Sequence, residues 1–141
     1  MQLGFLILCD RAEALDGKLY TLGGGWNTLR FPELPATFQF SIGIALDVPW
    51  GGTNQRHDLH IHVEGPDGER LGEAFEVEFE AGRPAGAIAG QDQRMVLAIH
   101  TQHTFETAGP HAAVASVDGE ELGRARFHVV RVPGPQGAPA G

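Results

Sequence analysis

Apolar and polar residues alternate along most of this chain, and this pattern limits its fold more than any other feature. Phe38, Phe40, Ile42, Ile44 and Leu46 are separated by smaller or polar residues, so they share one face of an extended strand. Helical spacing of apolar residues is not sustained in any window of the sequence. The pattern therefore predicts an all-β fold. The expected strands, about eight, cover residues 3–9, 18–23, 37–47, 57–64, 72–80, 94–103, 111–117 and 122–130.

Turn sequences separate the predicted strands. Asp16-Gly17, Pro66-Asp67-Gly68 and Asp118-Gly119 each lie between two alternating runs, which is a strong hairpin signal. Because hairpins join antiparallel neighbours, we expect an antiparallel β-sandwich, Ig-like or jelly-roll-like with Greek-key connections, in preference to a barrel. Residues 26–36 and 81–93 show no alternation, and we expect irregular connections there.

The length of 141 residues predicts a single domain. We assign residues 1–132 to the sandwich. Residues 133–141 are an uncharged tail rich in proline, glycine and alanine, which offers too little apolar surface to order itself. We expect this tail to be disordered.

The chain is acidic, with a formal net charge of −8. A nucleic-acid surface needs clustered lysine and arginine, so we expect no nucleic-acid partner. No apolar stretch approaches a membrane span, and the apolar run at residues 3–8 lacks the cationic start and cleavage site of a signal peptide. We therefore expect no membrane partner and a cytoplasmic location, where a lone thiol such as Cys9 suits the reducing conditions.

Several short motifs together resemble one known family. They are Leu8-Cys9-Asp10-Arg11-Ala12-Glu13, Asp16-Gly17-Lys18-Leu19-Tyr20, Gly23-Gly24-Gly25-Trp26, Val48-Pro49-Trp50 with Thr53-Asn54, and Val117-Asp118-Gly119-Glu120. With them the chain resembles an uncharacterised bacterial family, mainly actinobacterial, of single-domain proteins, from residue 3 to residue 130. The resemblance implies a β-sandwich, and it implies neither an activity nor site residues.

Histidine is the first candidate for a functional site, because the chain has seven and imidazole is the commonest metal ligand. His60 and His62 share one face of a predicted strand. If a neighbouring strand presented His100 or His103 opposite them, these side chains would form a site for zinc or another transition metal. The alternative is that the histidines are polar residues on the solvated face of antiparallel strands.

Trp26 and Trp50 are the second candidate, because each lies where a strand is expected to meet a loop. Such aromatic side chains either fill the open end of a sandwich or form a stacking surface for a ligand or partner. Filling is the commoner role. In the second role, Trp26, Trp50 and Asn54 would bind a protein, a small molecule or a carbohydrate at one end of the sandwich.

Catalytic motifs are not recognisable in the sequence. Ser41 and Ser116 lie within predicted strands and outside any nucleophile elbow. Glu76 and Glu78 repel each other on one strand face, where no apolar setting raises a carboxyl pKa. We therefore predict a non-enzymatic binding or structural module without a cofactor. It is expected to act by association with a protein partner or with further copies of itself, as a homo-oligomer.

Overall fold

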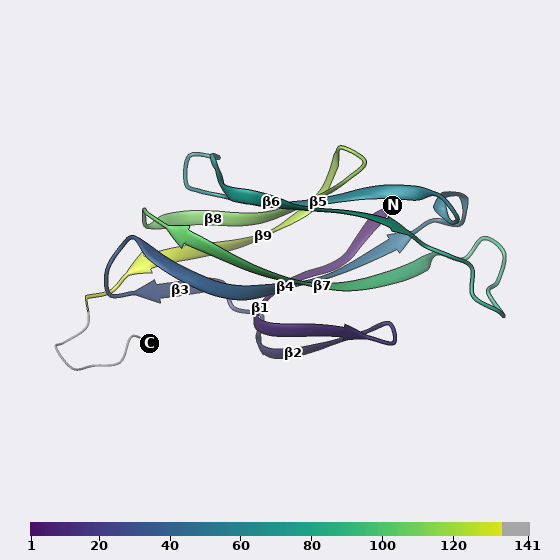
Figure 1. Cartoon of the computed structure of the whole chain (residues 1–141), viewed down its shortest axis with the longest axis horizontal. Helices are drawn as coiled ribbons and strands as arrows, with labels where there is room; N and C mark the ends of the chain where they lie inside the picture. The colour runs from purple at the N-terminus through teal and green to yellow at the C-terminus, as the bar shows by residue number, and fades with distance from the viewer. Residues whose placement is uncertain (134–141) are drawn as a thin grey trace.

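The computed structural model describes residues 1–133, which form nine strands and one short 3-10 turn (Figure 1). The elements are β1 (Gln2–Leu15), β2 (Lys18–Gly24), β3 (Thr28–Phe31), β4 (Ala36–Val48), η1 (Trp50–Gly52), β5 (Arg56–Glu64), β6 (Arg70–Glu80), β7 (Gln93–Phe105), β8 (Gly109–Val117) and β9 (Glu120–Arg131). The all-β prediction is confirmed. Within residues 1–133 no helix has the length and apolar character needed to cross a membrane. Of the predicted disordered tail, residues 134–141 lie outside the described residues.

The strands form two sheets that face each other as a sandwich (Figure 1). The four-stranded sheet has the order β2-β1-β4-β7, and the five-stranded sheet has the order β3-β9-β8-β5-β6. All pairings among the described strands are antiparallel except that of β3 with β9, which is parallel. The sandwich prediction is therefore confirmed, and β3 is a ninth strand in the stretch expected to be irregular. Its four residues are too few for alternation to reveal, and its partner strand is remote in sequence.

The inward faces of the two sheets form one apolar core. β4 contributes Phe40, Ile42 and Ile44, and β5 contributes Leu59 and Ile61 from the other sheet, with none of them more than 3% exposed. These are the alternating positions that predicted the strands. Burying a side chain of this size contributes about 1.5–3 kcal/mol, so the alternation that defines each strand also holds the two sheets together.

The hairpin of β1 and β2 adds a partial third layer (Figure 1). The first half of β1 pairs with β4, and its second half pairs with β2. The hairpin lies against the outer face of β4 and β7. On that face of β4 lie the small residues Ser41, Gly43 and Ala45, all of which are buried. A Cβ atom on Gly43 would collide with Leu19 of β2, so small residues on β4 make room for the hairpin.

Candidate functional site

Trp26 fills the end of the core at which β4 begins. The turn before it bends at Gly25, which has a φ of 84° and whose N–H donates to the Leu8 carbonyl oxygen at 2.8 Å. The indole N–H of Trp26 is buried and has no hydrogen-bond partner within residues 1–133. The ring lies edge-on to three phenylalanines, with centroid distances of 6.1 Å to Phe38, 5.6 Å to Phe40 and 5.8 Å to Phe127. Of the two roles predicted for this residue, the structure shows filling.

Trp50 lies in η1 and is covered by the connection between β6 and β7. The Arg83 guanidinium lies 3.7 Å from the centroid of the Trp50 ring. Arg83 also donates to the Trp50 carbonyl oxygen at 2.9 Å and to Thr53 Oγ1 at 2.6 Å. Asn54 is exposed, with a φ of 57°, and its backbone N–H donates to the Ala81 carbonyl oxygen at 2.8 Å. These contacts attach the β6–β7 connection to the end of β4, and one face of the Trp50 ring already has a partner.

The two tryptophans belong to opposite ends of β4. Trp26 packs against Phe38 and Phe40 near the start of the strand, whereas Trp50 follows its last residue, Val48. At about 3.3 Å per residue, roughly 26 Å of extended chain separates Phe40 from Val48. This placement corrects the expectation of one binding edge shared by Trp26, Trp50 and Asn54, because the two loops leave opposite ends of one strand.

His60 and His62 project from the outer face of the five-stranded sheet, as their spacing predicted. Their ring centroids are 5.8 Å apart. His60 Nε2 lies 3.1 Å from Glu76 Oε1, and His62 Nε2 lies 3.0 Å from Glu64 Oε1. Each ring is therefore paired with a carboxylate.

His100 and His103 lie on β7 in the other sheet, so they do not join the first two histidines. Because they are three residues apart on a strand, they point to opposite faces. His100 Nδ1 lies 2.8 Å from Ser41 Oγ on the outer face, whereas His103 is buried and its burial lowers its pKa. Among the described residues, no group of three or more His, Cys, Asp or Glu side chains is arranged to hold a metal ion. The four histidines of the expected metal site are thus divided between the two sheets.

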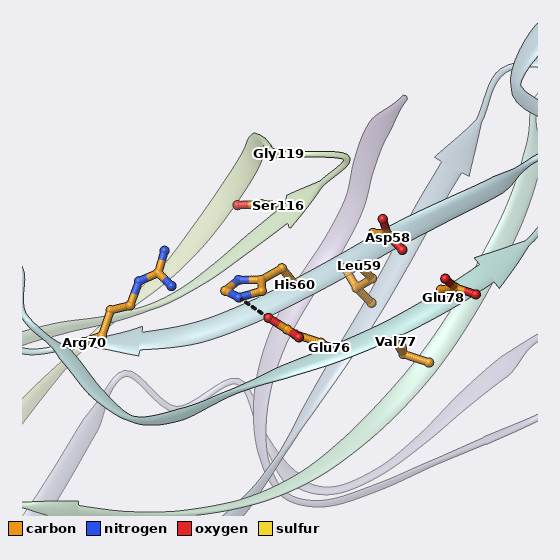
Figure 2. A pocket seen from close by; sticks show the side chains of 9 residues that line it. All are labelled: Asp58, Leu59, His60, Arg70, Glu76, Val77, Glu78, Ser116 and Gly119. Atoms are coloured by element: carbon orange, nitrogen blue, oxygen red, sulfur yellow. Dashed lines mark ion pairs between the residues drawn. The ribbon is translucent and has the colours of Figure 1, made fainter.

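An open depression of about 590 Å³ lies on the outer face of the five-stranded sheet (Figure 2). In Figure 2 the His60 ring points at the Glu76 carboxylate, whose side chain is 74% exposed. Solvent at this exposure screens the pair strongly. The polar side chains lining the depression are Asp58, His60, Arg70, Glu76, Glu78 and Ser116. Three carboxylates and one guanidinium make it a wet, acidic sheet surface.

A charged contact between His57 and Asp118 was missed by sequence reasoning. His57 is buried, with Nδ1 2.7 Å from Asp118 Oδ2 and Nε2 2.7 Å from the Gly52 carbonyl oxygen. A carbonyl oxygen and an ionised carboxylate both accept hydrogen bonds, so the two contacts are made together when the ring is an imidazolium that donates from both nitrogens. The bonds to Gly52 and Asp118 raise the pKa of His57, and the bond from His57 lowers the pKa of Asp118. His57 therefore connects β5 both to η1, which follows β4, and to the turn between β8 and β9.

Three large apolar side chains are exposed together on the β1–β2 hairpin. Leu15 is 60% exposed, Tyr20 55% and Leu22 71%. Tyr20 and Leu22 lie on the face of β2 opposite to Leu19, which packs onto β4. Leu15 pairs with Lys18 on that same exposed face. We call the surface formed by Leu15, Tyr20 and Leu22 the hairpin face. The sequence carries a sign of this exposed face, because β2 has apolar residues at both odd and even positions, and a strand that packs on one side only can bury just one of these sets.

The sequence model of one protein family covers almost the whole β-sandwich. This model, described as a family of unknown function (DUF6941), matches residues 4–130. The chain belongs to DUF6941. The predicted resemblance to an uncharacterised family is confirmed. The match covers nearly all of residues 1–133, the part of the chain that the structure describes.

The DUF6941 chain is also similar to parts of larger solved proteins. It is 17% identical to the Pseudomonas fluorescens alkylpurine DNA glycosylase AlkC bound to DNA containing an abasic site analog, covering 73% of this chain and 27% of that one with a TM-score of 0.37. It is 10% identical to the Listeria innocua β-glucosidase in complex with isofagomine, covering 89% of this chain and 16% of that one with a TM-score of 0.40. Curated proteins include no match to the chain. We draw no functional argument from similarities at this level.

Proposed function

We propose that this DUF6941 chain is a non-enzymatic binding module that acts by protein–protein association through the hairpin face. The observation that carries the proposal is the exposure of Leu15, Tyr20 and Leu22 side by side on one hairpin. Apolar side chains gathered on one exposed surface are typical of sites that contact another protein. Tyrosine is also enriched among the residues that contribute most to interface affinity.

The outer face of the five-stranded sheet is less suited to such a contact. A partner lying on it would remove water from Asp58, Glu76 and Glu78, and burying a carboxylate without a counter-charge is costly. Covering the hairpin face removes mainly apolar surface from water, which is favourable. We further propose that the protein acts in the cytoplasm, since its single thiol, Cys9, is fully buried and unpaired.

Size analysis of an extract from cells that produce the protein tests the proposal. The wild-type chain is expected to elute as a complex larger than a monomer. Leu22→Glu puts a charge on the hairpin face, at its most exposed residue, and should shift the chain to the monomer position. Ile88→Glu is the matched control, because Ile88 is 69% exposed in the β6–β7 connection and receives the same charge.

Two outcomes would contradict the proposal. One is elution of the wild-type chain as a monomer. The other is an equal shift caused by Leu22→Glu and Ile88→Glu, since the association would then depend on total charge and not on the hairpin face. Circular dichroism of each purified variant confirms that the sheets are intact.

A further inference from the structure

We infer that the partner at the hairpin face is a second copy of this chain, paired antiparallel along the outer edge of β2. The inference rests on the proposed function and names its partner. Among residues 1–133, β2 is one of the two edge strands of the four-stranded sheet, and β7 is the other. The outward N–H and C=O groups of an edge strand can pair with another strand, and this is a common route to association.

The edges of the two sheets differ in their protection against such pairing. β3 has four residues, and none of the large exposed apolar side chains lies on β7. β2 has Lys18 as its only charged residue and exposes Tyr20 and Leu22. β6 exposes Phe75 (39%) and Val77 (37%), but it also bears four exposed glutamates, which would set carboxylates near carboxylates in a self-paired edge: Glu73, Glu76, Glu78 and Glu80. The edge suited to a second copy is therefore that of β2.

Symmetry limits the register of this pairing. Opposed residues in an antiparallel pair share a face, so around a twofold axis odd-numbered residues oppose odd and even oppose even. With Thr21 opposite its own copy, Tyr20 lies opposite Leu22 of the second copy, and this contact occurs twice. Lys18 then lies opposite Gly24. Moving the axis to Tyr20 would instead place Lys18 opposite Leu22, so the register centred on Thr21 is the better match.

The charges on β1 fit the same register. Within one chain, Glu13 pairs with Tyr20 and Arg11 pairs with Leu22. The two symmetry-related rows that contain Tyr20 therefore run from Glu13 through Tyr20 to Leu22 and Arg11 of the other copy. Each of these two rows is apolar at its centre and carries opposite charges at its ends. A chain with a net charge of −8 thus meets its copy where no like charges oppose each other.

Sedimentation velocity of the purified full chain tests the inference. A seven-residue edge is a small contact, so we expect weak association. The protein concentration should therefore be varied over roughly two orders of magnitude, up to the high micromolar range. We expect a reversible monomer–dimer equilibrium, a dissociation constant at least about tenfold higher for Leu22→Glu, and no change for Ile88→Glu. A monomer at every concentration, or an equal response of both variants, would overturn the inference.

Cysteine cross-linking tests the register. A mixture of Tyr20→Cys and Leu22→Cys chains should form a disulfide on oxidation, because opposed residues have Cα atoms about 4.5–5.5 Å apart. Either variant alone should not, since its own copies lie diagonally at about 7–8 Å. Cys9 is fully buried and does not compete. Failure of the mixture to cross-link, or equal cross-linking by one variant alone, would overturn this register.

The two proposals fail in different ways. If the purified chain stays monomeric while the complex in cell extract is lost in Leu22→Glu, the second-copy inference is wrong and the proposed function holds. If the chain is monomeric in both experiments, both proposals are wrong.

Discussion

The contact between His57 and Asp118 depends on two opposite charges that coexist only over a limited pH range. The pKa of His57 is raised by its bonds to Gly52 and Asp118, against the opposing effects of burial and the N-terminal amine. The stabilisation of the folded state by charged His57 is therefore complete at a pH below the unfolded pKa of about 6.5. It is lost as the pH rises through the folded pKa. The pKa of Asp118 is lowered by its bonds to His57 and Asp58. Its contribution to the stability of the fold is therefore present above about pH 3.9 and is lost as the pH falls through the folded pKa.

His57→Gln is expected to show this pH dependence as a difference in unfolding free energy from the wild type. The difference should be largest between about pH 4.5 and 6, and it should shrink as the pH rises from about 6.5. Urea unfolding at a series of pH values measures it. His103, whose pKa is lowered, shifts stability in the opposite direction, but it does so in both proteins and cancels. A difference that is constant with pH would show that the His57 ring is not charged in the folded state.

The β1–β2 hairpin shows how a strand pattern is adapted to a third layer. β4 has large apolar residues on the face toward the core and small residues on the face under the hairpin. Alternation alone predicts a solvated outer face at these positions. Ser41 and Ala45 are nevertheless buried, because the chain turns at Asp16 and Gly17 and brings β2 back over the sheet.

Gly43→Val is expected to lower the unfolding free energy by about 1–3 kcal/mol, since the new side chain overpacks the space taken by Leu19. Leu19→Ala in the same chain should recover part of the loss. Chemical denaturation of the single and double variants measures this coupling. Gly82→Val is a suitable control, because a Cβ atom at Gly82 would meet nothing within 4 Å. Full additivity of Gly43→Val and Leu19→Ala would contradict the packing of the hairpin on β4.

Residues 1–133 share one core that connects the two ends of the sandwich. Trp26 lies at the start of β4 and Trp50 beyond its end, so the two indoles report on opposite ends of the sandwich. The core residues of β4 and β5 form one cluster between these ends. A domain of this size with one core normally unfolds in a single cooperative transition.

Two single-tryptophan variants test this cooperativity. In Trp50→Phe the fluorescence comes from Trp26, and in Trp26→Phe it comes from Trp50. Within each variant, the fluorescence and far-ultraviolet circular dichroism transitions in urea are expected to share one midpoint. If fluorescence preceded circular dichroism in either variant, that end would be unfolding on its own.

The sequence by itself determined the strands other than β3 and the apolar face of those that alternate, because alternation is a relation between residues two positions apart. It also determined that His60 and His62 share a face, for the same reason. Only the tertiary structure decided the strand order, the parallel pairing of β3 with β9, the contact of His57 with Asp118, and the separation of the two tryptophans. Each of these depends on which distant segments lie side by side, and local spacing carries no record of that choice.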